Sequence, residues 1–198
     1  MTPRKDVSLE RRAQMIQAAL ACFIRKGYVN TSMDDIAAES GLSKGSLYWY
    51  FPGKEELFVE SLKSVFSGLG EEVASRVNQH SSAGEKLQVM ADAAAEFGKT
   101  SQGYFSLFIE YWAQSSDRKK AGELWKVILE PYKQLIGGII REGVRKGEFR
   151  SVKAEPLAWA LMAAYDGLAT YQVFMPDLNL TPVYESFARF FMEGLRKE

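Results

Sequence analysis

The stretch that decides the fold runs from residue 31 to residue 57 and reads TSMDDIAAESGLSKGSLYWYFPGKEEL. Its apolar residues recur at helical spacing, and the pattern is interrupted at Gly41 and again at Pro52-Gly53. One short helix therefore ends at Gly41, and a second spans about residues 44–51. Two short helices joined by a three-residue turn predict a helix-turn-helix, whose second helix can enter a DNA major groove about 12 Å wide.

The pattern of helices alone leaves the function open, because many all-helical proteins contain such a corner without binding DNA. The 198 residues carry 25 Lys+Arg and 25 Asp+Glu, and this balance argues against a protein that holds nucleic acid by bulk charge alone. The charge is nevertheless uneven, since residues 1–54 contain eight basic and five acidic side chains, a net charge of +3. Such a split is typical of a protein whose one end meets a polyanion.

The same stretch closely resembles the DNA-binding signature of the tetracycline-repressor (TetR) family of bacterial regulators. The matching positions are Ile36-Ala37, Gly41, Ser43, Leu47-Tyr48, Phe51 and Lys54-Glu55-Glu56-Leu57. With the first helix, the resemblance covers about the first 60 residues, and the rest matches as a row of helices of the right number and length. Tyr50 departs from the pattern, which most often has histidine there, and this change affects a phosphate contact rather than the fold.

Helical spacing continues along nearly the whole chain without sustained alternation of apolar and polar residues, so we expect an all-α fold of about nine helices. The expected helices cover about residues 8–26, 33–40, 44–51, 54–77, 85–99, 103–115, 119–147, 155–175 and 182–196. Pro131 should kink or divide the seventh of them. We expect a helix-turn-helix DNA-binding domain at residues 1–53, and the resemblance implies a helical effector-binding and dimerisation domain at residues 54–198.

The second helix of the motif and its flanks supply the candidate DNA contacts: Thr31, Ser43, Lys44, Gly45, Ser46, Tyr48, Trp49, Tyr50 and Lys54. Because Gly45 has no side chain, the start of the helix can press against DNA. The hydroxyls and the flexible cation beside it suit contacts to phosphates or base edges. Either Thr31 or Ser32 can cap the helix at 33–40, and Thr31 can serve as a phosphate ligand as well as a cap, or as a cap only.

Three larger side chains of this set need partners outside the small core. Tyr48 and Trp49 point away from the apolar face of their helix. The resemblance implies a phosphate contact for Tyr48, whereas Trp49 either packs on thymine methyl groups and sugars or closes the small domain. Lys54 opens a helix whose dipole disfavours a cation, so a nearby phosphate would explain its presence.

A recognition helix of two turns reaches few bases, so we expect a homodimer on a palindromic operator in double-stranded DNA. The helix at 155–175 is rich in small residues, and the last helix carries phenylalanines on one side. The resemblance implies that these two helices pair with their symmetry mates as a four-helix bundle, although they must also form part of the intrachain core. The candidate interface residues are Ala160, Ala164, Phe187, Phe190, Phe191 and Leu195.

Eighteen of the 25 aromatic residues follow residue 60, and eleven of these cluster on helices that by resemblance would line an effector cavity. The candidate effector contacts are Phe105, Phe108, Glu110, Trp112, Trp125, Tyr132, Trp159, Tyr165 and Asp166. Each aromatic side chain is also explained as ordinary core. Glu110 and Asp166 are carboxylates in apolar stretches, and either a cationic ligand or an internal partner would satisfy them, unless Glu110 is simply exposed.

Catalytic and metal-binding signals are weak in this sequence. His80, the single histidine, lies in a polar loop without a second ligand, and no phosphate-binding or zinc-protease motif occurs. We therefore expect no enzyme, no cofactor and no metal. Cys22 cannot form an intrachain disulfide, and no apolar stretch is long enough to span a membrane, so we expect a cytoplasmic protein without a membrane partner.

These observations together predict a ligand-responsive transcriptional regulator, with repression as the usual mode of the family that it resembles. A TetR-like activator, or a helical enzyme or adaptor without a DNA role, are the alternatives. Two effector classes are open: flat or cationic drug-like molecules, which the aromatics and acids favour, and long apolar molecules such as acyl chains. The sequence names neither the operator, the regulated gene nor the effector.

Overall fold

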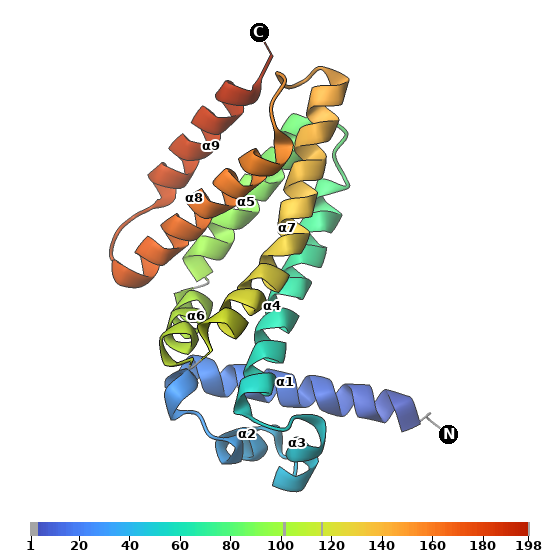
Figure 1. Ribbon diagram of the computed structural model, residues 1–198, viewed down its shortest axis with the longest axis vertical. Coiled ribbons are helices and arrows are strands. Elements are labelled where there is room, and N and C mark those ends of the chain that lie inside the picture. Colours follow the sequence, from blue (N-terminus) through green and yellow to red (C-terminus); the bar gives the residue numbers. More distant parts are fainter. Residues whose placement is uncertain (1–3, 101, 116, 198) are drawn as a thin grey trace. The chain divides into compact units, whose positions relative to one another are not determined.

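The computed structural model describes residues 4–100, 102–115 and 117–197, and nine α-helices follow one another in this part of the chain (Figure 1). They are α1 Arg4–Asn30, α2 Met33–Ser40, α3 Lys44–Tyr50, α4 Lys54–Val77, α5 Ala83–Thr100, α6 Gln102–Gln114, α7 Arg118–Lys146, α8 Ala154–Phe174 and α9 Thr181–Leu195. Among the described residues, the only β-type pairing is an isolated bridge between Phe149 and Arg196. The expected all-α fold is confirmed.

The two short helices begin and end at residues with capping side chains or glycine. The hydroxyl of Ser32 accepts a hydrogen bond from the Asp35 amide, and the Asp35 carboxylate accepts one from the Ser32 amide, which is a reciprocal capping box. Gly41, with a φ of 66°, ends α2 in the left-handed conformation that glycine adopts without strain. The Ser43 hydroxyl then caps α3 by accepting from the Ser46 amide. Local sequence therefore determines both ends of the turn.

Two helices differ from their expected extents. α1 begins at Arg4, before the expected start at residue 8, and it reaches Asn30 across Gly27, whose φ of 77° and ψ of 169° are not helical. α7 continues on both sides of Pro131, so the proline does not divide the helix. A single interior proline removes one backbone hydrogen bond, and a helix of 29 residues tolerates this loss.

The chain forms two units, and the boundaries between them fall inside helices. The first unit comprises residues 1–67 and 106–124, and the second comprises residues 68–105 and 125–198. Helices α4, α6 and α7 thus each contribute residues to both units. The domain boundary expected after residue 53 stays a prediction.

The first unit has an aromatic core. The Phe58 ring of α4 meets Phe23 of α1 edge-on, with ring centroids 5.1 Å apart, and its centroid lies 4.9 Å from that of Tyr111 in α6. All three side chains are buried. Because edge-to-face contacts and burial both favour this arrangement, a residue from α6 completes the core beneath the helix-turn-helix.

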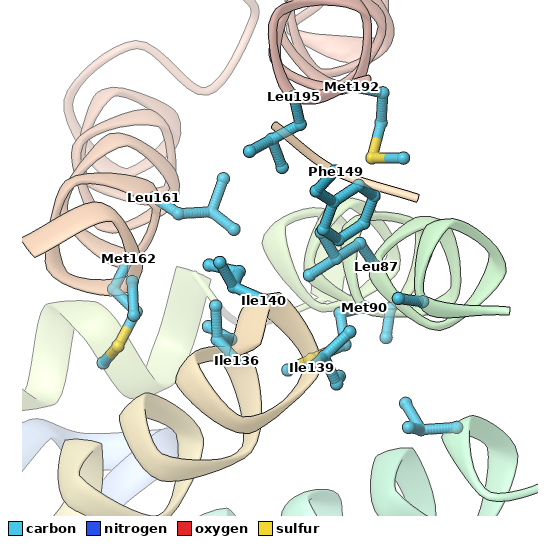
Figure 2. Packing of buried hydrophobic residues seen from close by; sticks show 14 of the residues in the cluster. Leu87, Met90, Ile136, Ile139, Ile140, Phe149, Leu161, Met162, Met192 and Leu195 are labelled. Atoms are coloured by element: carbon cyan, nitrogen blue, oxygen red, sulfur yellow. The ribbon is translucent and has the colours of Figure 1, made fainter. Parts of the chain in front are cut away.

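The core of the second unit is mainly aliphatic and contains one fully enclosed phenylalanine, Phe149, from the segment that connects α7 to α8; Figure 2 shows it beside Leu87 of α5 and Met192 and Leu195 of α9. The labelled residues around it come from α5, α7, α8 and α9: Leu87, Met90, Ile136, Ile139, Ile140, Leu161, Met162, Met192 and Leu195. The phenylalanine ring is 3% exposed and lies directly against the backbone of Gly143. The four helices can meet around the ring because position 143 has no side chain.

Gly143→Ala should destabilise the protein, since an added Cβ would overlap the buried Phe149 ring. The expected loss in the free energy of unfolding is about 1–3 kcal/mol. Gly138→Ala is the matched control in the same helix, because no atom lies within 4 Å of its added Cβ. It should leave stability unchanged or raise it by up to about 1 kcal/mol. Urea unfolding of the two variants checks this, and equal stabilities would contradict it.

Candidate functional site

Helix α3 is held by one face and presents the other to solvent. Leu47 and Phe51 are fully buried, whereas Tyr48 is 45% exposed and Trp49 is 76% exposed. The Trp49 ring meets Tyr50 edge-on at 4.7 Å between centroids, and the Tyr50 hydroxyl donates a hydrogen bond to Ser8 Oγ. Exposure of a tryptophan to this degree leaves its apolar surface available to a partner.

The start of α3 is open around Gly45. No atom lies within 4 Å of the position that a Cβ on Gly45 would take, so the fold of the free chain does not require glycine there. Lys44 and Ser43 beside it are exposed, and Ser46 is half-buried. Lys44 Nζ lies 2.7 Å from Asp34 Oδ1, and this hydrogen bond raises the pKa of the lysine. The geometry leaves room for a partner to approach the backbone closely.

Each acidic residue of α2 is paired with a cation. Besides the Lys44–Asp34 pair, Lys26 Nζ lies 2.6 Å from Asp35 Oδ1, and an Arg25 nitrogen lies 2.7 Å from Glu39 Oε2. The hydrogen bond from Lys26 is the main cause that lowers the pKa of Asp35. Exposed pairs of this kind add little stability. They do neutralise the carboxylates beside α3, which would otherwise repel a polyanion.

Thr31 and Lys54, two further candidate DNA contacts, are also bonded inside the first unit. Thr31 is 2% exposed and its hydroxyl donates to the carbonyl of Gly27 at 2.7 Å. Of the two residues that the sequence allows as the cap of α2, Thr31 and Ser32, it is Ser32 that caps the helix. Lys54 Nζ donates to the carbonyl oxygens of Tyr28, at 2.9 Å, and Val29, at 3.2 Å. These carbonyls, without any phosphate, account for a cation at the start of α4.

Glu110 also has an internal partner, which corrects its assignment as an effector contact. Its Oε2 accepts a hydrogen bond from the Tyr28 amide and its Oε1 accepts one from the Val29 amide, both at 2.9 Å. The residue before this pair, Gly27, leaves the space that the carboxylate occupies. Glu110 is therefore bonded to the end of α1.

Sequence reasoning missed a second set of contacts in this unit. The Tyr111 hydroxyl donates to Glu55 Oε1 at 3.0 Å, and Lys120 Nζ lies 2.9 Å from the same oxygen. Burial raises the pKa of Tyr111, and the bond to Lys120 is the main cause that lowers the pKa of Glu55. Tyr111 and Glu55 stand 56 positions apart in the sequence, so no local spacing could have indicated their contact.

The other effector candidates divide between the two units. Phe108 and Trp112 belong to the first unit, and Trp112 is 39% exposed. The members in the second unit are Phe105, Trp125, Tyr132, Trp159, Tyr165 and Asp166. The structure brings Phe105 and Trp125 together edge-on, with centroids 5.9 Å apart. Lys133 Nζ lies 5.5 Å from the centre of the Trp159 ring.

Asp166 of α8 is the unusual member of this set. Its side chain is mostly buried, and this burial raises its pKa to about 6. Among the residues that the structure describes, no cation or hydrogen-bond donor pairs with its carboxylate. Its charge is the second cause, after burial, that raises the pKa of the Tyr184 hydroxyl. Burial at this position disfavours the charged form of the carboxyl group.

The candidate dimer residues differ in exposure. Phe190 is 77% exposed and Ala160 is exposed, whereas Phe187 and Phe191 are partly buried against the core of the second unit and Ala164 is partly buried. Leu195 is 2% exposed and belongs to that core, so it is an intrachain core residue rather than a surface one. Within the described residues, no helix has the length and apolar character needed to cross a bilayer.

Residues 15–60, which contain the whole helix-turn-helix, match the model of the bacterial regulatory proteins of the tetR family. This part of the chain is a TetR-family DNA-binding domain. It is 26% identical over 171 residues to YfiR of Bacillus subtilis strain 168, an HTH-type transcriptional regulator described as uncharacterized, with 80% of this chain and 77% of YfiR covered. Members of the TetR family are DNA-binding regulators rather than enzymes, so the expectation of a non-enzymatic role is supported.

Solved structures share the fold of this chain over almost its full length. The FadR regulator of Bacillus subtilis, in complex with stearoyl-CoA, has a TM-score of 0.78 and 20% identity, with 92% of this chain and 98% of FadR covered. A regulator from Saccharomonospora viridis in complex with choline has a TM-score of 0.80 and 23% identity, with 96% and 99% covered. At these identities the likeness establishes the common fold.

The buried carboxylate predicts a pH dependence of stability. Because burial raises the pKa of Asp166 to about 6, above the usual value of an unfolded aspartate of about 3.9, the folded state binds the proton more tightly. The contribution of Asp166 should therefore make the free energy of unfolding fall as the pH rises from about 4 to about 6. Asp166→Asn should remove this fall and gain about 2 kcal/mol relative to wild type between those limits. Urea unfolding at pH 4.5 and 7.0 measures it, and a difference between the two proteins that stays constant with pH would contradict the prediction.

Proposed function

We propose that this TetR-family protein is a ligand-responsive repressor that binds a palindromic operator as a homodimer in the bacterial cytoplasm. The observation that carries the proposal is the outer surface of α3. There, exposed Lys44, Tyr48 and Trp49 surround a glycine with open space above it. A surface with a cation, two aromatic rings and free access to the backbone suits the phosphates and base edges of a major groove.

The proposed DNA contacts are the side chains that the free chain leaves accessible, together with the open glycine: Ser43, Lys44, Gly45, Ser46, Tyr48 and Trp49. Lys44 would exchange its exposed partner Asp34 for a phosphate, which is a small cost because exposed ion pairs contribute little. Tyr50 lies beside Trp49 and would support that ring while its hydroxyl stays bonded to Ser8. Trp49 would read thymine methyl groups by apolar contact.

Selection of bound duplexes from a random pool should yield a palindrome, and Lys44→Ala should then bind it more weakly. Loss of one phosphate contact should also reduce the slope of log affinity against log salt by about 0.9 per subunit. Lys119→Ala is the control, an exposed lysine of α7 in the same unit. It should leave both the affinity and the slope close to wild type. Fluorescence anisotropy measures both, and a pool that yields no preferred sequence would refute the DNA-binding role.

The dimer is proposed to form through the outer surface of α8, α9 and their connection. The large apolar side chains exposed there are Trp159, Tyr171, Phe174, Met175, Leu178, Val183 and Phe190. Soluble monomers seldom expose so many large apolar groups on two successive helices. The family resemblance implies pairing through the same two helices, which supports this proposal.

Phe190→Asp should shift the protein from dimer to monomer, because the 77% exposed ring would otherwise be buried between subunits. Val127→Asp is the matched control, since Val127 is 54% exposed on α7, outside the proposed interface. It should remain dimeric. Sedimentation velocity at micromolar concentration distinguishes the two, and a wild-type protein that is monomeric with and without operator DNA would rule out the dimer.

The effector is proposed to be a small apolar, aromatic or cationic molecule that binds the helical region and releases DNA. Similar folds hold a long acyl chain in one protein and a quaternary ammonium in another. The buried carboxylate of Asp166, without a cation among the described residues, favours the cationic class. Stearoyl-CoA and choline added to the operator complex test the two classes. The releasing compound must bind the free protein more tightly than the complex by the factor with which it weakens operator binding.

A further inference from the structure

The break in α1 at Gly27 leaves the next two peptide groups outside a regular helix. The φ of 77° and ψ of 169° at Gly27 interrupt the ladder of backbone hydrogen bonds three residues before α1 ends. The two amides lose their helical acceptors at this break, and the two carbonyl oxygens lie in the last turn of α1, where carbonyls have no helical donor. Tyr28 and Val29 therefore need two acceptors and two donors from elsewhere in the fold.

Two charged side chains from distant helices supply all four partners. The carboxylate of Glu110, in α6, accepts hydrogen bonds from both amides at 2.9 Å. The ammonium of Lys54, at the start of α4, donates to both carbonyl oxygens at 2.9 Å and 3.2 Å. We call this arrangement the 28–29 clamp. Each of its bonds has one charged member, and such bonds are stronger than neutral ones.

Neighbouring contacts hold the clamp in one geometry. The Tyr28 ring lies under the Lys54 ammonium, 4.6 Å from it, and meets Phe58 edge-on at 4.7 Å and Tyr111 at 5.3 Å between centroids. A Cβ at Gly27 would lie 2.8 Å from Glu110 Oε2, so glycine permits both the backbone turn and the approach of the carboxylate. Backbone, aromatic and charge contacts thus converge on one dipeptide.

The clamped dipeptide leads directly into the helix-turn-helix. Only Asn30 separates it from Thr31, whose buried hydroxyl donates to the Gly27 carbonyl, and the next residue, Ser32, caps α2. α2 in turn contacts α3, which carries the proposed DNA contacts. A shift of residues 28 and 29 would therefore displace the start of α2 and the recognition helix that follows it.

We propose that Glu110 and Lys54 are positioning residues for DNA binding, which act together through the 28–29 clamp. This inference rests on the proposed DNA-binding function and deepens it. It replaces the role of Glu110 as an effector contact and that of Lys54 as a phosphate ligand. It also makes α6, which lies outside the 31–57 signature, part of the DNA-binding apparatus.

Glu110→Gln tests the clamp against simple electrostatics. Removal of a negative charge should tighten binding to a polyanion, whereas loss of one acceptor from the clamp should weaken operator binding by about tenfold, the usual effect of one hydrogen bond to a charged group. Glu56→Gln is the matched control, because it removes the same charge from an exposed residue of α4 in the same unit. It should bind the operator as tightly as wild type or slightly more tightly.

Lys54→Met separates positioning from phosphate contact. A positioning lysine lowers affinity without changing the salt slope, whereas a lost phosphate contact reduces the slope by about 0.9 per subunit. The Glu110→Gln/Lys54→Met double variant should bind little more weakly than either single variant, because both changes open the same clamp. If the losses of operator affinity in the two single variants added up in the double variant, Glu110 and Lys54 would not act jointly.

Measurements well below the unfolding temperature distinguish a positioning role of Glu110 and Lys54 from a contribution to overall stability alone. Circular dichroism should show that the variants are folded at 10 °C, and the amide hydrogens of Tyr28 and Val29 should exchange faster in Glu110→Gln than in wild type. A folded Glu110→Gln protein with wild-type operator affinity, or unchanged exchange at both amides, would overturn the inference. If the wild type selects no operator, the proposed function fails, and amide exchange still decides whether the clamp exists.

Discussion

The first unit depends on how the chain satisfies two peptide groups after α1 breaks at Gly27. The break turns the chain toward α2, but it also leaves the following two amides without helical partners, and the carbonyls of the same residues, in the last turn of α1, have no helical partners either. A carboxylate from α6 and an ammonium from α4 replace these partners. The helix-turn-helix is therefore completed by residues that lie beyond its own sequence motif.

Charge in this protein is organised by local pairing rather than by net balance. The N-terminal region carries a small positive excess, yet each acid of α2 is already paired with a lysine or arginine. The pairs are exposed and contribute little to folding. Their effect is on the electrostatic potential beside α3, because a neutralised carboxylate no longer repels an approaching phosphate.

Glu110 and Asp166 show why a sequence pattern cannot assign the partner of a carboxylate in an apolar helical stretch. Both lie in apolar helical stretches, where an internal donor, a cation or a ligand would satisfy each of them. Folding brings two backbone amides to Glu110 and makes it a structural acceptor. It brings no such donor to Asp166 among the described residues, and burial therefore raises the pKa of that group to about 6.

The sequence by itself determined the helices, the turn and the family, because these depend on short-range signals. Caps such as Ser32 and Ser43, the left-handed Gly41 and the apolar periodicity all act within a few residues. Only the tertiary structure decided the roles of Glu110, Lys54 and Leu195. Glu110 stands 82 positions from the amide of Tyr28, and no local pattern encodes which buried group will meet which unpaired peptide. Those partners are fixed by the packing of distant helices, since every buried donor and acceptor must be satisfied at the same time.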